Sequence, residues 1–428
     1  MLSFTKPLAL ILFLGAACGA LAKEADDDTS NPGYAQVDVS VAPDPSGLPA
    51  KPAGFVHPGV LVNQGQLAEI ARRVAAGIEP QKSAFVLARD SIYGVRGYVA
   101  HPRFMVECGS YSTPDLGCKA EQGDSLAAYT QALLWIATGD HTYAAKAIEI
   151  MNGWSTVLRK GHTNANGPVQ AAWTGELWPR AAEIIRYSNA GWSDADIARF
   201  QNMLRTQYLP SLIHGTTENG NKELSMSEAL INIGVFLDDR KVFNHGLRMW
   251  RGRAPAYIYL PSDGPKPVEP FGAGPAIWGN KRYTPKLVAG LLQETARDSQ
   301  HANLALASMV NAAETARQQG VDLYAEQGKR IMAALEYQAQ FLTPNHGTPP
   351  AQLKFNLHPT WEIAYNEYHG RLGQELPLMG AVIMGHRPTE TNHMMAWETL
   401  THGDMGAIGL PQIAKPLVAR VVPNALDV

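Results

Sequence analysis

The stretch LAAYTQALLWIATGDHTYAAKAIEIMNGW, residues 126–154, decides the fold class. Apolar residues recur at helical spacing before its central Gly-Asp pair and again after it, which predicts two amphipathic helices. Gly139 ends the first helix and Asp140 caps the second. The stretch therefore predicts a helical hairpin with a very short turn.

Similar signals extend along the chain from His57 onward. Ser193 resembles a capping residue before a helix, and Thr284-Pro285 and His358-Pro359 each place a cap residue before a first-turn proline. Together the patterns predict about a dozen helices joined by short turns. We therefore expect an all-α protein in which stacked helical hairpins close into a ring.

Strand signals are few. The best is Tyr257–Leu260, with short pieces near residues 37–41. No strand–helix–strand alternation and no glycine-rich phosphate loop after a strand occur in the sequence. This pattern argues against a nucleotide enzyme.

Residues 1–22 are typical of an export signal. Lys6 precedes the apolar run from Leu8 to Ala17, which is too short to span a bilayer. Ala20-Leu21-Ala22 offers small residues at the positions a signal peptidase reads, and Cys18 leaves lipoprotein processing open. We expect cleavage after Ala22 and a periplasmic or secreted protein.

The expected mature chain has two parts. Residues 23–56 form a proline-rich arm, and residues 57–428 form a single domain. Cys108 and Cys118 lie ten positions apart in a loop-like stretch. Cysteines this close usually pair in an oxidising compartment, so we predict a disulfide.

Charge and motifs exclude several function classes. The formal net charge of -3 is not the strongly basic charge typical of a nucleic-acid-binding protein. A local cluster of cations could still bind an anionic polysaccharide. The 13 histidines show no paired metal-ligand spacing, and no G-x-S-x-G elbow occurs. We therefore predict no cofactor, no metal, no nucleic acid and, after signal removal, no membrane partner.

Two segments concentrate polar and aromatic residues inside apolar helices. Residues 172–180 place Trp173 and Trp178 beside Glu176 and Arg180, which suits sugar stacking or a core with a buried ion pair. The segment around Asn219 and Asn221 places amides at a helix start. That start predicts either a site for a carboxylate or plain helix capping.

A third segment, residues 293–301, spaces Glu294, Arg297 and His301 so that they would share one helix face. A histidine and an arginine on one face could handle a proton and a carboxylate, although a solvated salt-bridge face is the alternative.

The fourth segment, residues 360–371, is the densest in polar and aromatic residues. In it Tyr365 and His369 lie one turn apart, as do Glu362 and Asn366. A tyrosine beside cations loses its proton more readily, which favours a proton-transfer role. The alternative is an aromatic core with charges on the helix surface.

With these segments, the chain resembles the alginate-lyase-like family of helical polysaccharide lyases over roughly residues 57–401. The resemblance rests on GNKELSMSEALINIGVFLDDR (220–240), WRGRAPAYIYLPSDGP (250–265), segments within 293–324, and TWEIAYNEYHGRLG (360–373). More narrowly, it resembles secreted bacterial lyases that cut β-1,4-linked glucuronan or mannuronate-rich alginate. Lys222 departs from the aromatic residue expected there.

The resemblance implies an (α/α)6 or (α/α)7 toroid, an incomplete helical barrel with an open cleft on one face, and metal-independent β-elimination. By this comparison Tyr365 transfers the proton and His301 holds the sugar or takes the C5 proton. Asn221, with Asn219 and Arg297, neutralises the substrate carboxylate. The remaining expected contacts with substrate are Trp173, Glu176, Trp178, Arg180, Glu362, Asn366, His369 and Arg371.

Two other functions stay open at this stage. A glycoside hydrolase on a helical toroid would need two carboxylates about 5–10 Å apart. Its candidates are Glu176, Glu294, Asp298 and Glu362. An exported polysaccharide-binding protein would keep the tryptophans and arginines without Tyr365 and His301. We expect a monomer, and the sequence leaves uronate preference, endo or exo action, and the acid and base assignments open.

Overall fold

The computed structural model describes residues 54–218, 220–270, 278, 284–343, 349–350, 355, 361–392 and 394–409. All of them belong to one compact unit, residues 53–428. The predicted signal, nearly all of the predicted arm and the pieces near residues 37–41 lie outside the described residues. No helix in the described part is long and apolar enough to cross a membrane.

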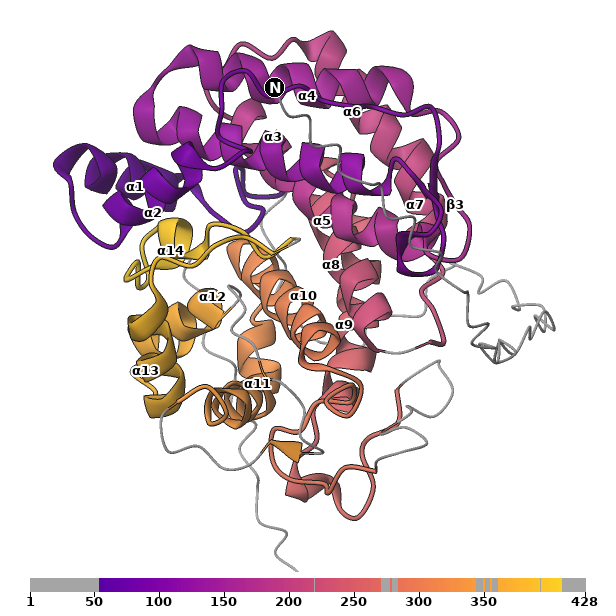
Figure 1. Cartoon of the computed structure of the whole chain (residues 1–428), viewed down its shortest axis with the longest axis vertical. Coiled ribbons are helices and arrows are strands. Elements are labelled where there is room, and N and C mark those ends of the chain that lie inside the picture. Colours follow the sequence, from indigo (N-terminus) through magenta and orange to yellow (C-terminus); the bar gives the residue numbers. More distant parts are fainter. Residues whose placement is uncertain are drawn as a thin grey trace, which may run out of the picture. The chain divides into compact units, whose positions relative to one another are not determined.

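The described chain is mainly helical, with the elements labelled in Figure 1. The first nine helices are α1 (Gln64–Ala76), α2 (Gln81–Asp90), α3 (Cys118–Thr138), α4 (His141–Val157), α5 (Gly167–Arg186), α6 (Asp194–Met203), α7 (Leu209–Leu212), α8 (Gly220–Phe236) and α9 (Arg240–Tyr257). The later ones are α10 (Ser299–Gln318), α11 (Leu323–Ala339), α12 (Trp361–Tyr365), α13 (Pro377–His386) and α14 (Glu398–His402). Short π-helical turns follow α6 and α12, at Leu204–Tyr208 and Asn366–Arg371.

The helices pack as a ring with an inner and an outer layer. Along the inner layer α3 packs on α5, α5 on α8, α8 on α10, and α10 on α12. Helices α4, α9, α11 and α13 cover α3, α8, α10 and α12 from outside. The series closes because α14 packs on both α12 and α2, and α2 packs on α3. This arrangement confirms the predicted all-α toroid of hairpins closed into a ring.

Local chemistry explains the first hairpin. Gly139 adopts a left-handed conformation (φ 69°, ψ 9°) at the end of α3, and its N–H donates to the carbonyl of Trp135. Glycine accepts this conformation without steric cost. The Asp140 side chain then accepts the N–H of Thr142 and caps α4. Both predictions for this turn are confirmed.

A small sheet supports the start of α3. Its order is β2-β1-β3, where β1 (Val106–Cys108) pairs antiparallel with β2 (Asp115–Leu116) and parallel with β3 (His162–Thr163). Cys108 in β1 and Cys118 at the start of α3 form a disulfide with Cα atoms 5.9 Å apart. The predicted disulfide is therefore present, and it joins the sheet to an inner helix.

Two local predictions were wrong. Tyr257 ends α9, and beyond it Ile258 forms only an isolated bridge with Leu292. No helix begins at Thr284-Pro285, because the following backbone instead pairs with Tyr259: the N–H of Gly290 donates to the Tyr259 carbonyl. The helix start expected at His358 lies outside the described residues.

Candidate active site

A cluster of polar side chains lies at the N-terminal ends of α8 and α10, two inner helices that pack on each other. The turn that precedes α10 and the last residue of α9 complete it. We call this group the Glu294 cluster, and it consists of Asn221, Tyr257, Glu294, Arg297, Asp298 and His301.

The Glu294 carboxylate is the acceptor at its centre. The Asn221 side-chain Nδ2 lies 2.7 Å from both carboxylate oxygens, and the Asn221 backbone N–H donates to one of them at 3.3 Å. The Tyr257 hydroxyl and the Arg297 Nη1 each donate at 3.0 Å. With the carboxylate only 5% exposed, these donors compensate its loss of water.

Tyr257 serves as a donor in this cluster. Burial, together with the negative charge of Glu294, raises the pKa of the Tyr257 phenol well above its ordinary value. The hydroxyl therefore stays protonated and donates to Glu294. Because Tyr257 is fully buried, its ring cannot contact a substrate.

The predicted helix face of residues 293–301 does not form. Residues 293–297 make turns, and α10 begins only at Ser299 because the Asp298 side chain caps it by accepting the N–H of His301 at 2.7 Å. The turn nevertheless brings together the side chains that the prediction grouped. Arg297 bonds to Glu294 and lies 3.9 Å from Asp298, measured from Nε to Oδ2.

His301 presents one ring nitrogen to its surroundings. Its Nδ1 lies 2.8 and 2.7 Å from the two carboxylate oxygens of Asp298. Burial opposes ionisation of Asp298, but the hydrogen bonds from the side chain and backbone of His301 outweigh it and lower the Asp298 pKa. Among the described residues Nε2 has no hydrogen-bond partner, and the side chain is 25% exposed.

Tyr365 occupies a different place. It ends α12, stacks on His369 with ring centroids 4.7 Å apart, and lies against Gly380 of α13. Within the described part of the chain, no hydrogen bond, ion pair or ring contact joins it to Asn221, Arg297 or His301. Burial raises the pKa of Tyr365, and the nearby Arg387 offsets only part of that rise. The expectation that cations would favour the phenolate was wrong.

The segment around Trp178 belongs largely to the core. Trp178, Glu176 and Arg180 are almost completely buried. Trp178 Nε1 donates to the Tyr208 hydroxyl at 2.7 Å, and Arg180 forms an ion pair with Glu228. The alternative of core packing with a buried ion pair therefore describes these three residues, and the prediction that they contact substrate does not fit. Trp173 is half-buried beside the core.

The segment after α12 is similarly engaged in internal contacts. Glu362 is buried and paired with Arg387, which corrects its prediction as a substrate contact. Asn366 accepts the backbone N–H of Gly406 at 2.7 Å, and Arg371 pairs with Glu367. His369 is exposed, with Nδ1 lying 3.0 Å from the carbonyl of Gln374. Asn219 lies outside the described residues.

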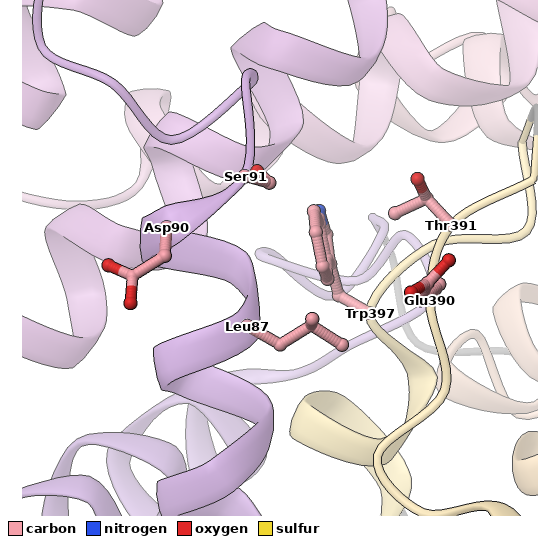
Figure 2. Close-up of a pocket in the computed structure, with 6 residues that line it drawn as sticks. All are labelled: Leu87, Asp90, Ser91, Glu390, Thr391 and Trp397. Atoms are coloured by element: carbon pink, nitrogen blue, oxygen red, sulfur yellow. The ribbon is translucent and has the colours of Figure 1, made fainter.

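A separate cavity of about 260 Å³ lies between the end of α2 and the segment before α14 (Figure 2). Its lining carries two carboxylates and no cation, and none of its residues was predicted as a site residue. The lining residues are Leu87, Asp90, Ser91, Glu390, Thr391 and Trp397. An anionic polymer would meet like charges here, so the cavity does not suit a uronate carboxylate.

Comparisons with known proteins agree with the toroid. The family model for alginate lyase matches residues 113–269. Alginate lyase A1-III from Sphingomonas species A1 has a TM-score of 0.51 at 17% identity, over 83% of this chain and 99% of that chain. Its Tyr-to-Phe variant complexed with tetrasaccharide has a TM-score of 0.56 at 17% identity, over 82% and 97%. No curated protein matches the sequence.

Over residues 113–269 the chain is similar to the alginate lyase family, and its fold is similar to that of alginate lyase A1-III. Both likenesses agree with the alginate-lyase-like resemblance of the sequence and support a polysaccharide lyase. The matched segment runs from α3 to just beyond α9 and so includes Asn221 and Tyr257, whereas the rest of the Glu294 cluster follows it.

Sequence reasoning missed two members of the Glu294 cluster. The sequence alone suggests Asp298 only as a candidate catalytic carboxylate of the alternative glycoside hydrolase. An aspartate directly before an apolar helical run is nevertheless a recognisable helix-capping signal. Tyr257 was interpreted as part of a strand, and no local signal connects it to Glu294, because 37 positions separate them.

Proposed function

We propose that this lyase cleaves β-1,4-linked uronate polymers, either glucuronan or mannuronate-rich alginate, by β-elimination without a metal. The observation that carries the proposal is that Arg297 and His301 lie on either side of Asp298, with Arg297 Nε at 3.9 Å and His301 Nδ1 at 2.7 Å from its Oδ2. The Arg297 side chain is 38% exposed and that of His301 is 25% exposed. A cation and a ring nitrogen can thus both reach one bound sugar.

The chemistry requires such a pair. The C5 proton of a uronate is a poor acid, because the carbanion left behind would lie beside a carboxylate. A guanidinium bound to that carboxylate withdraws its charge, so we assign Arg297 to this task. His301 then removes the C5 proton, and an acid protonates the departing O4.

Asn221 supports this site in a different way from the one the sequence suggested. Its amide already donates to Glu294, and Glu294 in turn holds Arg297. We therefore assign Asn221 to positioning, while Arg297 contacts the carboxylate.

We retain Tyr365 as the proposed acid. A phenol with a raised pKa keeps its proton until O4 departs, which suits a donor better than a base. The Trp361 Nε1 donates to Asn303 at 3.0 Å, which ties α12 to the beginning of α10, where His301 lies. We also propose export through residues 1–22 to the periplasm or beyond, where such polymers are accessible.

The hydrolase alternative loses support from the same contacts. Its candidate carboxylates are already engaged: Glu294 by four donors, Asp298 by His301, and Glu362 by Arg387. Glu176 is fully buried. A hydrolase needs one carboxyl group free to protonate the leaving oxygen and another free to activate water or attack the sugar.

The test is to incubate the protein lacking residues 1–22 with glucuronan, polymannuronate, polyguluronate and hyaluronan. Elimination produces a conjugated, unsaturated uronate that absorbs in the ultraviolet. We expect absorbance to rise with glucuronan or polymannuronate. New reducing ends without absorbance would support a hydrolase, and intact polymer with measurable binding would support a binding protein; either result would reject the proposal.

A further inference from the structure

We infer that Asp298 is a positioning residue that makes His301 the base of the elimination, with Nε2 as the atom that takes the proton. This inference rests on the proposed function and deepens it. The role of Asp298 is then to orient His301, whereas the sequence alone suggested Asp298 only as a catalytic carboxylate of a hydrolase.

The hydrogen bonds fix the tautomer of the ring. An ionised carboxylate can only accept, so the His301 Nδ1 that lies 2.8 and 2.7 Å from the Asp298 oxygens must carry a proton. In neutral imidazole the other nitrogen then holds the lone pair. That nitrogen, Nε2, is the one without a hydrogen-bond partner among the described residues. The basic atom is therefore the accessible one.

The helix start fixes both partners of the contact. Asp298 is the N-cap of α10, and its side chain also accepts the backbone N–H of His301 at 2.7 Å. Its own N–H donates to the carbonyl of Glu294 at 3.3 Å. One carboxylate thus caps the helix and orients the ring three residues later, so the base needs little reorganisation before reaction.

The ionisable groups next to His301 carry a net negative charge. In the described part of the chain, the ionisable groups linked to this contact are Arg297, which lies 3.9 Å from Asp298, and then Glu294 with its donor Tyr257. With His301 neutral and Tyr257 protonated, one cation faces two carboxylates. When His301 takes the C5 proton, the imidazolium that forms is therefore stabilised by this negative charge.

The reaction balances without an added reagent. Nε2 takes the C5 proton, the C5–H electrons form the C4–C5 double bond, and the C4–O4 bond breaks. The departing oxygen takes a proton from the acid that we assign to Tyr365. Solvent then removes the proton from His301 and restores that of Tyr365. The products are an unsaturated uronate end and a new hydroxyl end.

The experiment compares Asp298→Asn, His301→Ala and the double variant. Asparagine caps a helix about as well as aspartate, so the melting temperature should change little. Its amide can donate to Nδ1 and move the proton to Nε2, and we expect kcat/KM to fall on the order of 10²–10⁴-fold. The double variant should be no worse than His301→Ala, because Asp298 acts through the ring.

Two controls separate positioning from folding. Asp322→Asn alters the N-cap of α11, where the side chain accepts the N–H of Ala325 at 3.0 Å, and it should leave activity unchanged. Asp298→Ser keeps a capping oxygen and serves if the asparagine variant fails to fold. Near-normal activity of Asp298→Asn, or fully multiplicative losses in the double variant, would overturn the inference.

Nitrogen NMR of the ring gives a readout that needs no substrate. The native protein should show a protonated Nδ1, and Asp298→Asn a protonated Nε2. A native ring protonated at Nε2 would reject the inference even if unsaturated product forms. If the native protein forms no such product, the lyase function and the base assignment both fail, and the NMR result alone decides whether Asp298 sets the tautomer.

Discussion

The Glu294 carboxylate accepts the Asn221 side-chain amide at 2.7 Å through both of its oxygens, at the first turn of α8. The helix start that the sequence offered as a carboxylate site therefore already holds a carboxylate of the chain itself. We therefore expect Arg297, which also donates to Glu294, to bind the substrate carboxylate in place of Asn221.

Changing Asn221 to aspartate should destabilise the protein. The variant sets a second carboxylate against Glu294 in a buried site, and we expect a loss of about 3–5 kcal/mol in unfolding free energy. Adding Glu294→Gln restores an amide–carboxylate pair with its polarity reversed and should recover part of that stability. Urea unfolding of the two single variants and the double variant measures this. If the stability losses of the two single variants simply add in the double variant, the result would contradict the contact between Asn221 and Glu294.

Replacing Arg297 by methionine should remove most activity with little effect on stability, since the guanidinium is 38% exposed and its ion pair is partly screened. Arg251→Met is the matched control, because Arg251 also pairs with a glutamate, Glu326, at 2.7 Å and lies outside the Glu294 cluster. Steady-state kinetics on the accepted polymer is the measurement. Equal effects of the two substitutions would argue against a role for Arg297 in binding the carboxylate.

Tyr365→Phe should lower turnover by about 10²–10⁴-fold while the melting temperature stays nearly constant. No hydrogen bond of its hydroxyl is present in the described part of the structure, so its loss breaks no such contact. Tyr368→Phe is the control: its hydroxyl donates to the carbonyl of Tyr324 at 3.2 Å, and losing that bond should cost about 1 kcal/mol of stability but no activity. Substantial turnover by Tyr365→Phe would show that another group protonates the departing O4 and would reject Tyr365 as the acid.

The buried Glu176 predicts a pH dependence of stability. Burial and the neighbouring Glu228 carboxylate raise its pKa well above 4.5. Between its ordinary and its raised pKa the folded state holds a proton that the unfolded state has lost, so stability falls as the pH rises through that window. Glu176→Gln removes this loss and should gain stability relative to the native protein as the pH rises.

Denaturant unfolding at about pH 5 and pH 8 tests this sign. Glu228→Gln is the comparison, because it breaks the buried ion pair with Arg180 and should cost about 3–5 kcal/mol. If the unfolding free energy of Glu176→Gln relative to that of the native protein decreased as the pH rises, the result would contradict a raised pKa of Glu176.

Local signals in the sequence were sufficient for the hairpins and the disulfide. Gly139 and Asp140 act within four residues of their partners, and Cys108 and Cys118 are ten positions apart, so their structural consequences can be derived from the chain alone. The ring also follows from this pattern, because many amphipathic hairpins with short turns bury their apolar faces by packing on one another.

Long-range contacts could not be derived in this way. Asn221 meets Glu294 across 73 positions, and no local pattern reports such a pairing. The same limit explains Arg180 and Trp178, whose sequence suits a sugar-binding surface as well as a core. Distant partners bury them: Trp178 packs against Trp154 and Phe200, and Arg180 pairs with Glu228 of α8. Burial likewise reversed the expected direction for the Tyr365 pKa.

Digestion of the accepted polymer in heavy-oxygen water, followed by mass spectrometry of the products, tests the central claim most directly. Elimination adds no water, so each cut should leave one product lighter by a water molecule than a hydrolysis product, and the unsaturated end should carry no label. The account predicts this outcome for the native protein and its loss in His301→Ala. Products that are all saturated, with the mass of one water gained for each cut, would show that water was added across the bond and would contradict elimination.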